Sequence, residues 1–376
     1  MVDTMGRVIK ATKPELASYE SYTEEIKSIW ETGIMTNNGS KVRRFCEKIK
    51  TYINCSNVDL FVNGHSAMLA ALAVVDLPRG AEVLTSPFTF VSTTNAIVQS
   101  GFTPVFCDID NTYNIDIDSI RRNITSKTCA IVTPHIFGIP CHVKEIEEIA
   151  REYNLKVVYD GAQAFGTKMN GKSIAEYGDA TMFSFHAIKI FNAIEGGALV
   201  YKDMKLKEKL ELYRNFGISY GTTNDVQVLG INAKMTEFSA AMGIINLPQL
   251  DGVIGRRKEL AEHYRKVFDS IPGISIYPYE DHIDYNYAYF PVIVEVEKYG
   301  KTRDEVWNDL RQYHIETRKL YDTLTCDFSY YKDKSYKRDV KYATEMTRKC
   351  LDFPMYSSLM EEDIDYIGEM LQMIKK

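Results

Sequence analysis

Residues 181–198 read Thr-Met-Phe-Ser-Phe-His-Ala-Ile-Lys-Ile-Phe-Asn-Ala-Ile-Glu-Gly-Gly-Ala, an apolar run followed by a loop and a glycine pair. This pattern predicts a strand that ends near Ser184, a loop that carries His186 and Lys189, and a second strand after the glycines. In open α/β sheets, ligands bind in the crevice beyond the ends of the strands. The apolar and aromatic neighbours of Lys189 argue against an ordinary solvated lysine. We therefore expect an amine that can form a Schiff base with a carbonyl cofactor.

A second apolar strand ends upstream, in the stretch Val157-Val-Tyr-Asp160-Gly-Ala-Gln163. A carboxylate directly after a buried strand is what pyridoxal phosphate (PLP) requires. It faces the pyridine nitrogen and keeps the ring protonated, so that the ring acts as an electron sink. The alternative for Asp160 is a helix N-cap.

Two further strand ends carry weaker signals. In Phe61-Val-Asn-Gly64-His65, glycine lets the backbone approach an anion, and the amides at a helix start suit a phosphate; an ordinary strand–helix turn is the alternative. In Thr85-Ser-Pro-Phe88-Thr-Phe90, an aromatic side chain after the strand could stack on a flat ring or simply pack in the core.

The wider chain alternates apolar runs with helical patterns, which predicts a mainly parallel sheet covered by helices. The expected strands are 58–62, 82–86, 103–108, 130–134, 156–159, 180–184 and 197–201, and the expected helices between them are 66–75, 91–100 and 143–153. Residues 15–50 are expected to be helical with a break at 33–40, and residues 236–268 with a break at Pro248. A strand at 288–296 and a helix at 302–313 follow. We predict a large α/β domain over 1–250 and a smaller α+β domain over 251–376.

Composition narrows the class of protein. The 376 residues carry a net charge of −6, which gives no electrostatic case for a nucleic-acid partner. No apolar run approaches the roughly 20 residues of a membrane span, and residues 1–14 lack the apolar core of a secretory signal. The seven cysteines form no C-x-x-C pair and no zinc-type cluster with histidine. We expect a cytoplasmic protein with reduced thiols and no metal site.

Taken together, these segments resemble the DegT/DnrJ/EryC1/StrS family of PLP-dependent sugar aminotransferases, which have the aspartate-aminotransferase fold (PLP fold type I). The resemblance begins at Gly33-Ile-Met-Thr-Asn-Asn-Gly39 and ends at Leu351-Asp-Phe-Pro-Met-Tyr356. Its most specific motif is Ser-Phe-His-Ala-x-Lys followed by Glu-Gly-Gly, from Ser184 to Gly197.

The resemblance implies roles for nine residues. Lys189 would be the Schiff-base lysine and general base, and Asp160 the partner of the pyridine nitrogen. Gln163 would donate to the ring hydroxyl, and His186 would line the catalytic site beside the lysine.

The other roles concern the phosphate and the flat ring of the cofactor. Gly64, His65 and Ser184 match phosphate-binding positions. Phe90 matches the aromatic residue that stacks on the ring, and Phe88 is the second candidate for this role. Asn232 matches a residue that reaches the phosphate from the neighbouring subunit, which implies a homodimer with shared sites.

The implied reaction moves an amino group from L-glutamate to a nucleotide-linked keto-6-deoxy sugar, as in deoxy amino sugar and O-antigen polysaccharide synthesis. We favour C4 of a dTDP-4-keto-6-deoxyhexose, with a 3-keto sugar as the alternative. Related dehydratases have His in place of Lys189, so dehydration is disfavoured; synthesis of an aromatic amino acid, or a non-catalytic regulator that binds PLP or a sugar, stays open.

The sequence departs from the family pattern in two places. His65 stands where many members have threonine, and Asp-Thr-Leu-Thr-Cys follows Tyr321 where Pro-Leu-His is common.

Overall fold

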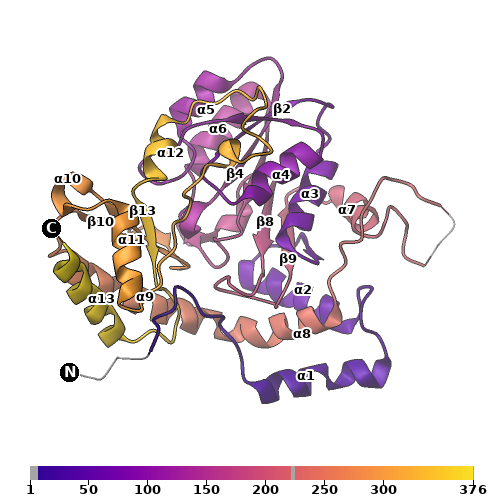
Figure 1. Cartoon of the computed structure of the whole chain (residues 1–376). Coiled ribbons are helices and arrows are strands. Elements are labelled where there is room, and N and C mark those ends of the chain that lie inside the picture. Colours follow the sequence, from indigo (N-terminus) through magenta and orange to yellow (C-terminus); the bar gives the residue numbers. More distant parts are fainter. Residues whose placement is uncertain (1–6, 222–224, 376) are drawn as a thin grey trace.

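The computed structural model describes residues 7–221 and 225–375, so the expectation about residues 1–14 falls partly outside the described residues. A seven-stranded sheet in the order β1-β9-β8-β5-β4-β2-β3 forms the centre of the larger part (Figure 1). Its strands are β1 (Val58–Phe61), β2 (Glu82–Thr85), β3 (Thr103–Phe106), β4 (Thr128–Pro134), β5 (Lys156–Asp160), β8 (Ala180–Ser184) and β9 (Gly197–Tyr201). The run from β8 to β3 is parallel, whereas β9 pairs antiparallel with both β8 and β1. The predicted mainly parallel α/β sheet is confirmed.

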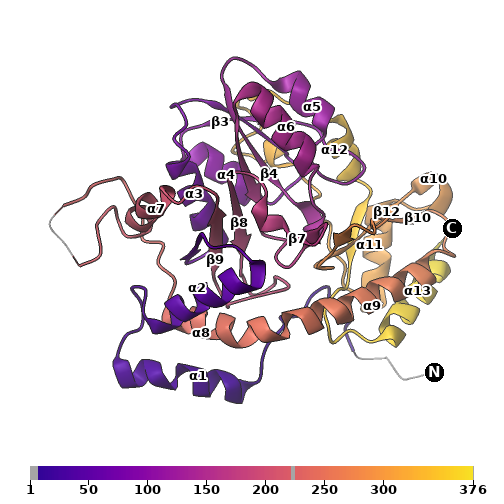
Figure 2. The same ribbon diagram turned by 180° about the vertical axis from the view of Figure 1, so that it is seen from behind.

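Helices cover both faces of this sheet, which explains why its strands are apolar along almost their whole length. One face carries α3 (Gly64–Val74), α4 (Val91–Gln99) and α7 (Leu206–Arg214). The other carries α2 (Ser40–Ile53), α5 (Ile117–Asn123), α6 (Val143–Tyr153) and α8 (Glu237–Asn246), most of them nearest the viewer in Figure 2. Because α3 faces the strands with Ala67, Ala70 and Ala71, all fully buried, it packs closely against β8 and β9.

The C-terminal part is a separate antiparallel sheet with helices on it. Pro248 lies in a 3-10 turn (Leu247–Gln249) between α8 and α9 (Leu250–Phe268), so the predicted break is confirmed. The sheet order is β10-β12-β13, with bounds Ile274–Ile276, Phe290–Val294 and Cys350–Phe353. Helices α9, α11 (Arg303–Gln312) and α13 (Glu361–Ile374) pack together around it (Figures 1 and 2).

The remaining elements are short or peripheral. They are α1 (Tyr19–Thr32), α10 (Val296–Tyr299), α12 (Lys341–Met346), a small sheet of β6 (Lys168–Met169), β7 (Lys172–Ser173) and β11 (Ile283–Asp284), and 3-10 turns at Ile136–Gly138, Ile174–Glu176 and Thr325–Asp327.

Two segments connect the parts of the chain in space. Near the N-terminus, Ile9 forms a parallel bridge with Ile315. After α11 the chain returns to the large sheet, where Arg338 bridges Phe106.

The division of the chain into two domains at residue 250 stays a prediction. Over residues 7–221 and 225–375, no helix has the length and apolar character needed to cross a bilayer.

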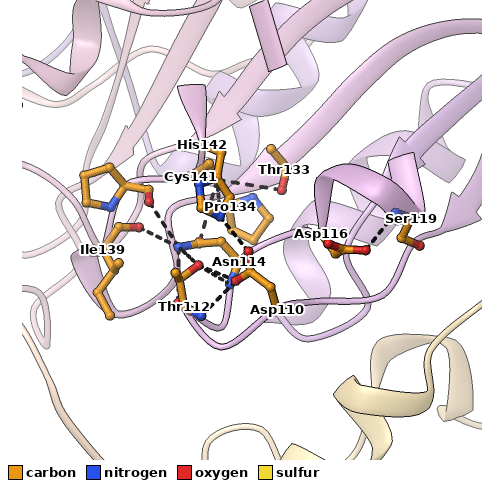
Figure 3. Close-up of polar contacts among 11 residues, drawn as sticks. Asp110, Thr112, Asn114, Asp116, Ser119, Thr133, Pro134, Ile139, Cys141 and His142 are labelled. Atoms are coloured by element: carbon orange, nitrogen blue, oxygen red, sulfur yellow. Dashed lines mark hydrogen bonds and ion pairs between the residues drawn. The ribbon is translucent and has the colours of Figure 1, made fainter. Parts of the chain in front are cut away.

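A polar cluster fixes the loop between β3 and α5 against the start of α6 (Figure 3). The Asn114 amide donates to the Ile139 carbonyl at 3.1 Å and accepts from the Ile136 N–H at 2.9 Å. The Asp110 carboxylate lies 2.5 Å from His142 Nε2, and this hydrogen bond raises the pKa of His142. Burial raises the pKa of Asp110, but its hydrogen bonds outweigh burial and hold it below the ordinary value.

We expect this pair to make stability depend on pH. Because the pKa of His142 is raised in the folded protein, its protonation stabilises the fold. This contribution is complete below about pH 6.5, the pKa of histidine in the unfolded chain, and is lost as the pH rises through the pKa of His142 in the folded protein. Because the pKa of Asp110 is lowered in the folded protein, its ionised form also stabilises the fold. This contribution is complete above about pH 3.9, the pKa of aspartate in the unfolded chain, and is lost as the pH falls through the pKa of Asp110 in the folded protein. His142 is 37% exposed, so the pair is partly screened. His142→Gln should cost about 0.5–1 kcal/mol of unfolding free energy near pH 5.5 and less at pH 9, measured by urea denaturation.

The matched control is His282→Gln, because His282 lies 3.5 Å from Glu280 with both side chains about half exposed. Its effect should be smaller at both pH values. An equal loss at pH 5.5 and pH 9 for His142→Gln would show that the pair is not charged in the folded state.

Candidate active site

A cavity of about 330 Å³ lies at the carboxyl ends of β4, β5 and β8, which is where parallel sheets place ligands. The predicted site residues that line it are Gly64, His65, Phe90, Asp160, Gln163, Ser184, His186 and Lys189. Asn232 is exposed and forms a bridge with Asn215 instead. Eight predicted residues thus come together, and Asn232 lies outside the cavity of its own chain.

Asp160 is the last residue of β5 and is 6% exposed. Its Oδ1 accepts from the Ala162 N–H at 3.0 Å, and its Oδ2 accepts from the Thr93 hydroxyl at 2.6 Å. The residues after Asp160 form turns, so the helix N-cap alternative does not apply. Two donors from different elements therefore fix the direction of a buried carboxylate.

Gln163 follows on the same turn and is held at both ends of its amide. Its Oε1 accepts from the Phe137 N–H, and its Nε2 donates to the Tyr321 hydroxyl at 2.6 Å. Burial raises the pKa of Tyr321 well above its ordinary value, so the phenol keeps its proton. Since Nε2 carries two hydrogens, one remains for a ligand.

Lys189 is half-buried, and its loop turns back on itself. The Lys189 N–H donates to the His186 carbonyl at 2.9 Å, while the side-chain Nζ lies 3.5 Å from the Tyr289 hydroxyl. The His186 ring lies on the same loop, with Nε2 3.4 Å from Glu195 Oε1. An amine, an imidazole and a carboxylate thus share one wall of the cavity.

The start of α3 forms another wall. Asn63 caps the helix by accepting from the Ser66 N–H at 2.8 Å, and the amides of Gly64 and His65 precede that point. The first N–H groups of a helix have no acceptor within the helix. A Cβ on Gly64 would lie 2.9 Å from Ser184 Cβ, so only glycine lets β8 come this close.

The imidazole of His65 points toward α4. Its Nδ1 lies 2.8 Å from the Ser92 hydroxyl, and its Nε2 lies 3.0 Å from Gln99 Oε1. The side chain of His65 is therefore used to join α3 to α4, which leaves its backbone amide as the group available at the helix start.

Sequence reasoning assigned no role to Thr93, Tyr289 or Tyr321. Thr93 lies one helical turn after Phe90. Its role is to donate a hydrogen bond to Asp160, and a contact between residues so far apart in the chain could not be predicted from the sequence. The two tyrosines come from the C-terminal part of the chain. No local pattern indicated Tyr289, and Tyr321 was noted only as the residue that precedes a departure from the family pattern.

The family model for the DegT/DnrJ/EryC1/StrS aminotransferase family matches residues 17–372. The chain belongs to this family. The resemblance seen in the sequence is therefore confirmed.

Relatives of this DegT-family aminotransferase match over nearly its full length. A dTDP-4-amino-4,6-dideoxy-D-glucose transaminase from Shigella dysenteriae is 35% identical over 372 residues, covering 99% of this chain and 100% of the relative. The Escherichia coli enzyme of the same name is 34% identical over 377 residues, covering 99% of both. The solved structure of DesI in the presence of its TDP-sugar product has a TM-score of 0.90 at 28% identity, covering 97% of this chain and 92% of DesI.

Proposed function

We propose that this DegT-family aminotransferase binds PLP in the cavity and transfers an amino group from L-glutamate to a nucleotide-linked keto-6-deoxy sugar. One observation supports this above all: the buried Asp160 carboxylate and the Lys189 amine line one cavity of about 330 Å³. The names of the two transaminase relatives favour C4 of a dTDP-4-keto-6-deoxyhexose.

The residues present fit the cofactor. The amides at the start of α3 and the Ser184 hydroxyl suit a phosphate, and the buried Asp160 suits a protonated pyridine nitrogen. The Phe90 ring, 65% exposed at the cavity, suits stacking on a flat ring. PLP, when bound, supplies the electron sink for the reaction.

The protein side chains then hold charge and move protons. Lys189 Nζ takes the proton from the α-carbon of the amino donor, and such a positioned base contributes on the order of 10²–10⁴-fold. Asp160 stabilises positive charge at the ring nitrogen, with its carboxylate fixed by Thr93 and Ala162. Gln163 donates its remaining N–H to the ring hydroxyl, and His186 lines the substrate side.

We also propose a cytoplasmic homodimer in which Asn232 reaches the phosphate of the second subunit. Asn232 is exposed and outside its own cavity, and the segment before it exposes apolar side chains: Val226, Val228 and Leu229. An apolar segment of this kind favours burial by another chain.

The test combines a spectrum with product analysis. The holoenzyme should show a visible band that shifts when L-glutamate is added. The glutamate-treated protein should then aminate dTDP-4-keto-6-deoxyglucose, with the product identified by mass and the position of nitrogen by NMR. Amination of the corresponding dTDP-3-keto-6-deoxy sugar, and not of the 4-keto sugar, would establish the 3-keto alternative. A band that glutamate does not shift would contradict transamination and favour a binding-only regulator.

A further inference from the structure

Tyr289 contacts Lys189 from the C-terminal part of the molecule. It directly precedes β12, it is buried, and its hydroxyl is the hydrogen-bonding partner of Lys189 Nζ at 3.5 Å, 100 residues away in sequence. This distance is long for a hydrogen bond. Such contacts at catalytic groups are often long before a ligand arrives and shorten afterwards.

The position of Tyr289 is fixed by a partly buried ion pair. Arg318 donates from Nε at 2.9 Å and from Nη2 at 2.6 Å to Asp352 Oδ2, and its guanidinium lies 5.1 Å from the centre of the Tyr289 ring. Asp352 Oδ1 accepts from the N–H of Phe290, the residue after Tyr289, at 2.9 Å. One fully buried carboxylate thus holds both the backbone beside Tyr289 and the cation over its ring.

Tyr289 also packs against the ring of Phe137, the residue whose N–H donates to Gln163. The Phe137 ring centre lies 5.8 Å from that of Tyr289 and 6.3 Å from that of Tyr321. Tyr321 in turn accepts from Gln163. With Arg318 and Phe137 both packed against the ring of Tyr289, its hydroxyl has little freedom to leave Lys189.

We infer that Tyr289 is a positioning residue for Lys189: its phenol oxygen accepts a hydrogen bond from the amine and holds it facing the cavity whenever the amine has no covalent partner. This inference rests on the proposed function. A lysine side chain has four rotatable bonds, and a free amine spends its time in many rotamers. A base accelerates a reaction only when it is held close to the proton it takes. Tyr289 supplies that restraint.

The variant Tyr289→Phe removes the hydroxyl and keeps the ring. The matched control is Tyr287→Phe, because Tyr287 lies two residues earlier and packs its ring against Tyr279. With the holoenzyme, we expect kcat of Tyr289→Phe to fall about 2–10-fold, which is the rate equivalent of one hydrogen bond. KM for both substrates should stay unchanged, and the isotope effect with α-deuterated glutamate should rise because proton transfer becomes slower.

A second readout uses the apoprotein and needs no turnover. The rate at which it captures PLP at one fixed pH, followed by absorbance, depends on how well the amine is held facing the cavity. Loss of one hydrogen bond that holds the amine should slow capture about 2–10-fold in Tyr289→Phe. The capture rate of Tyr287→Phe should equal that of the wild type. A role of Tyr289 in stability alone would move the melting temperature but not this rate.

The outcomes separate the two proposals. Capture by the wild type with an unchanged capture rate and isotope effect in Tyr289→Phe would overturn the role of Tyr289 and leave the proposed function standing. No capture of PLP by the wild type at any pH would overturn the proposed function and the inference together.

Discussion

Replacement of Lys189 by alanine is expected to abolish both the visible band of the bound cofactor and turnover. The amine is the cavity group that can bond to an aldehyde, and it is also the proposed base for the donor α-carbon. Loss of the base alone predicts a fall in kcat on the order of 10²–10⁴-fold, and loss of covalent attachment adds to it. Absorbance spectra and an assay with glutamate and a nucleotide keto sugar would measure both effects.

The matched control is Lys172→Ala, because Lys172 is an exposed lysine on β7 and is not among the described residues that line the cavity. That variant should keep the band and the rate. Normal transamination by Lys189→Ala would refute the assignment of the amine, and the cavity would then need another nucleophile.

Asp160→Asn should lower kcat on the order of 10²–10³-fold while the covalent band still forms. The carboxylate is 6% exposed, and removal of a preorganised charge or donor from such a site has this size of effect. Asparagine keeps the shape and can still accept from Thr93, so the fold should survive. The rate of the half-reaction with glutamate, followed by stopped-flow absorbance, would measure the effect directly.

Two variants test whether the charge of Asp160 itself matters. Thr93→Val removes one hydrogen bond to the carboxylate and should cost only about 2–10-fold. Asp118→Asn changes a carboxylate on α5 and should leave the rate unchanged. If Asp160→Asn were no slower than Thr93→Val, the hydrogen-bond geometry rather than the charge would be the important property.

The features that sequence could predict are local ones. Asp160 and Ser184 each end an apolar run, and ligand crevices of open α/β sheets lie beyond the ends of the strands. The break at Pro248 follows from the missing N–H of proline. These predictions needed only residue type and short spacing.

The features that sequence could not predict depend on tertiary contacts. The antiparallel direction of β9 was not foreseen, because an apolar run reads the same in either direction. Tyr289 reaches Lys189, and Tyr321 reaches the cavity, after the chain has passed through α9 and folded back. The predicted role of Asn232 concerns a second subunit. A single chain does not test this role, because Asn232 lies outside the cavity of its own chain.

The bridge between Ile9 and Ile315 has a consequence for the order of events on the ribosome. Lys10 pairs with Glu316 across 306 residues of sequence in the same region. At synthesis rates of about 5–20 residues per second, the early segment waits roughly 15–60 s before its partner exists. During that interval Ile9 has no bridge partner, and the synthesis of Ile315 sets the earliest time at which the bridge can form.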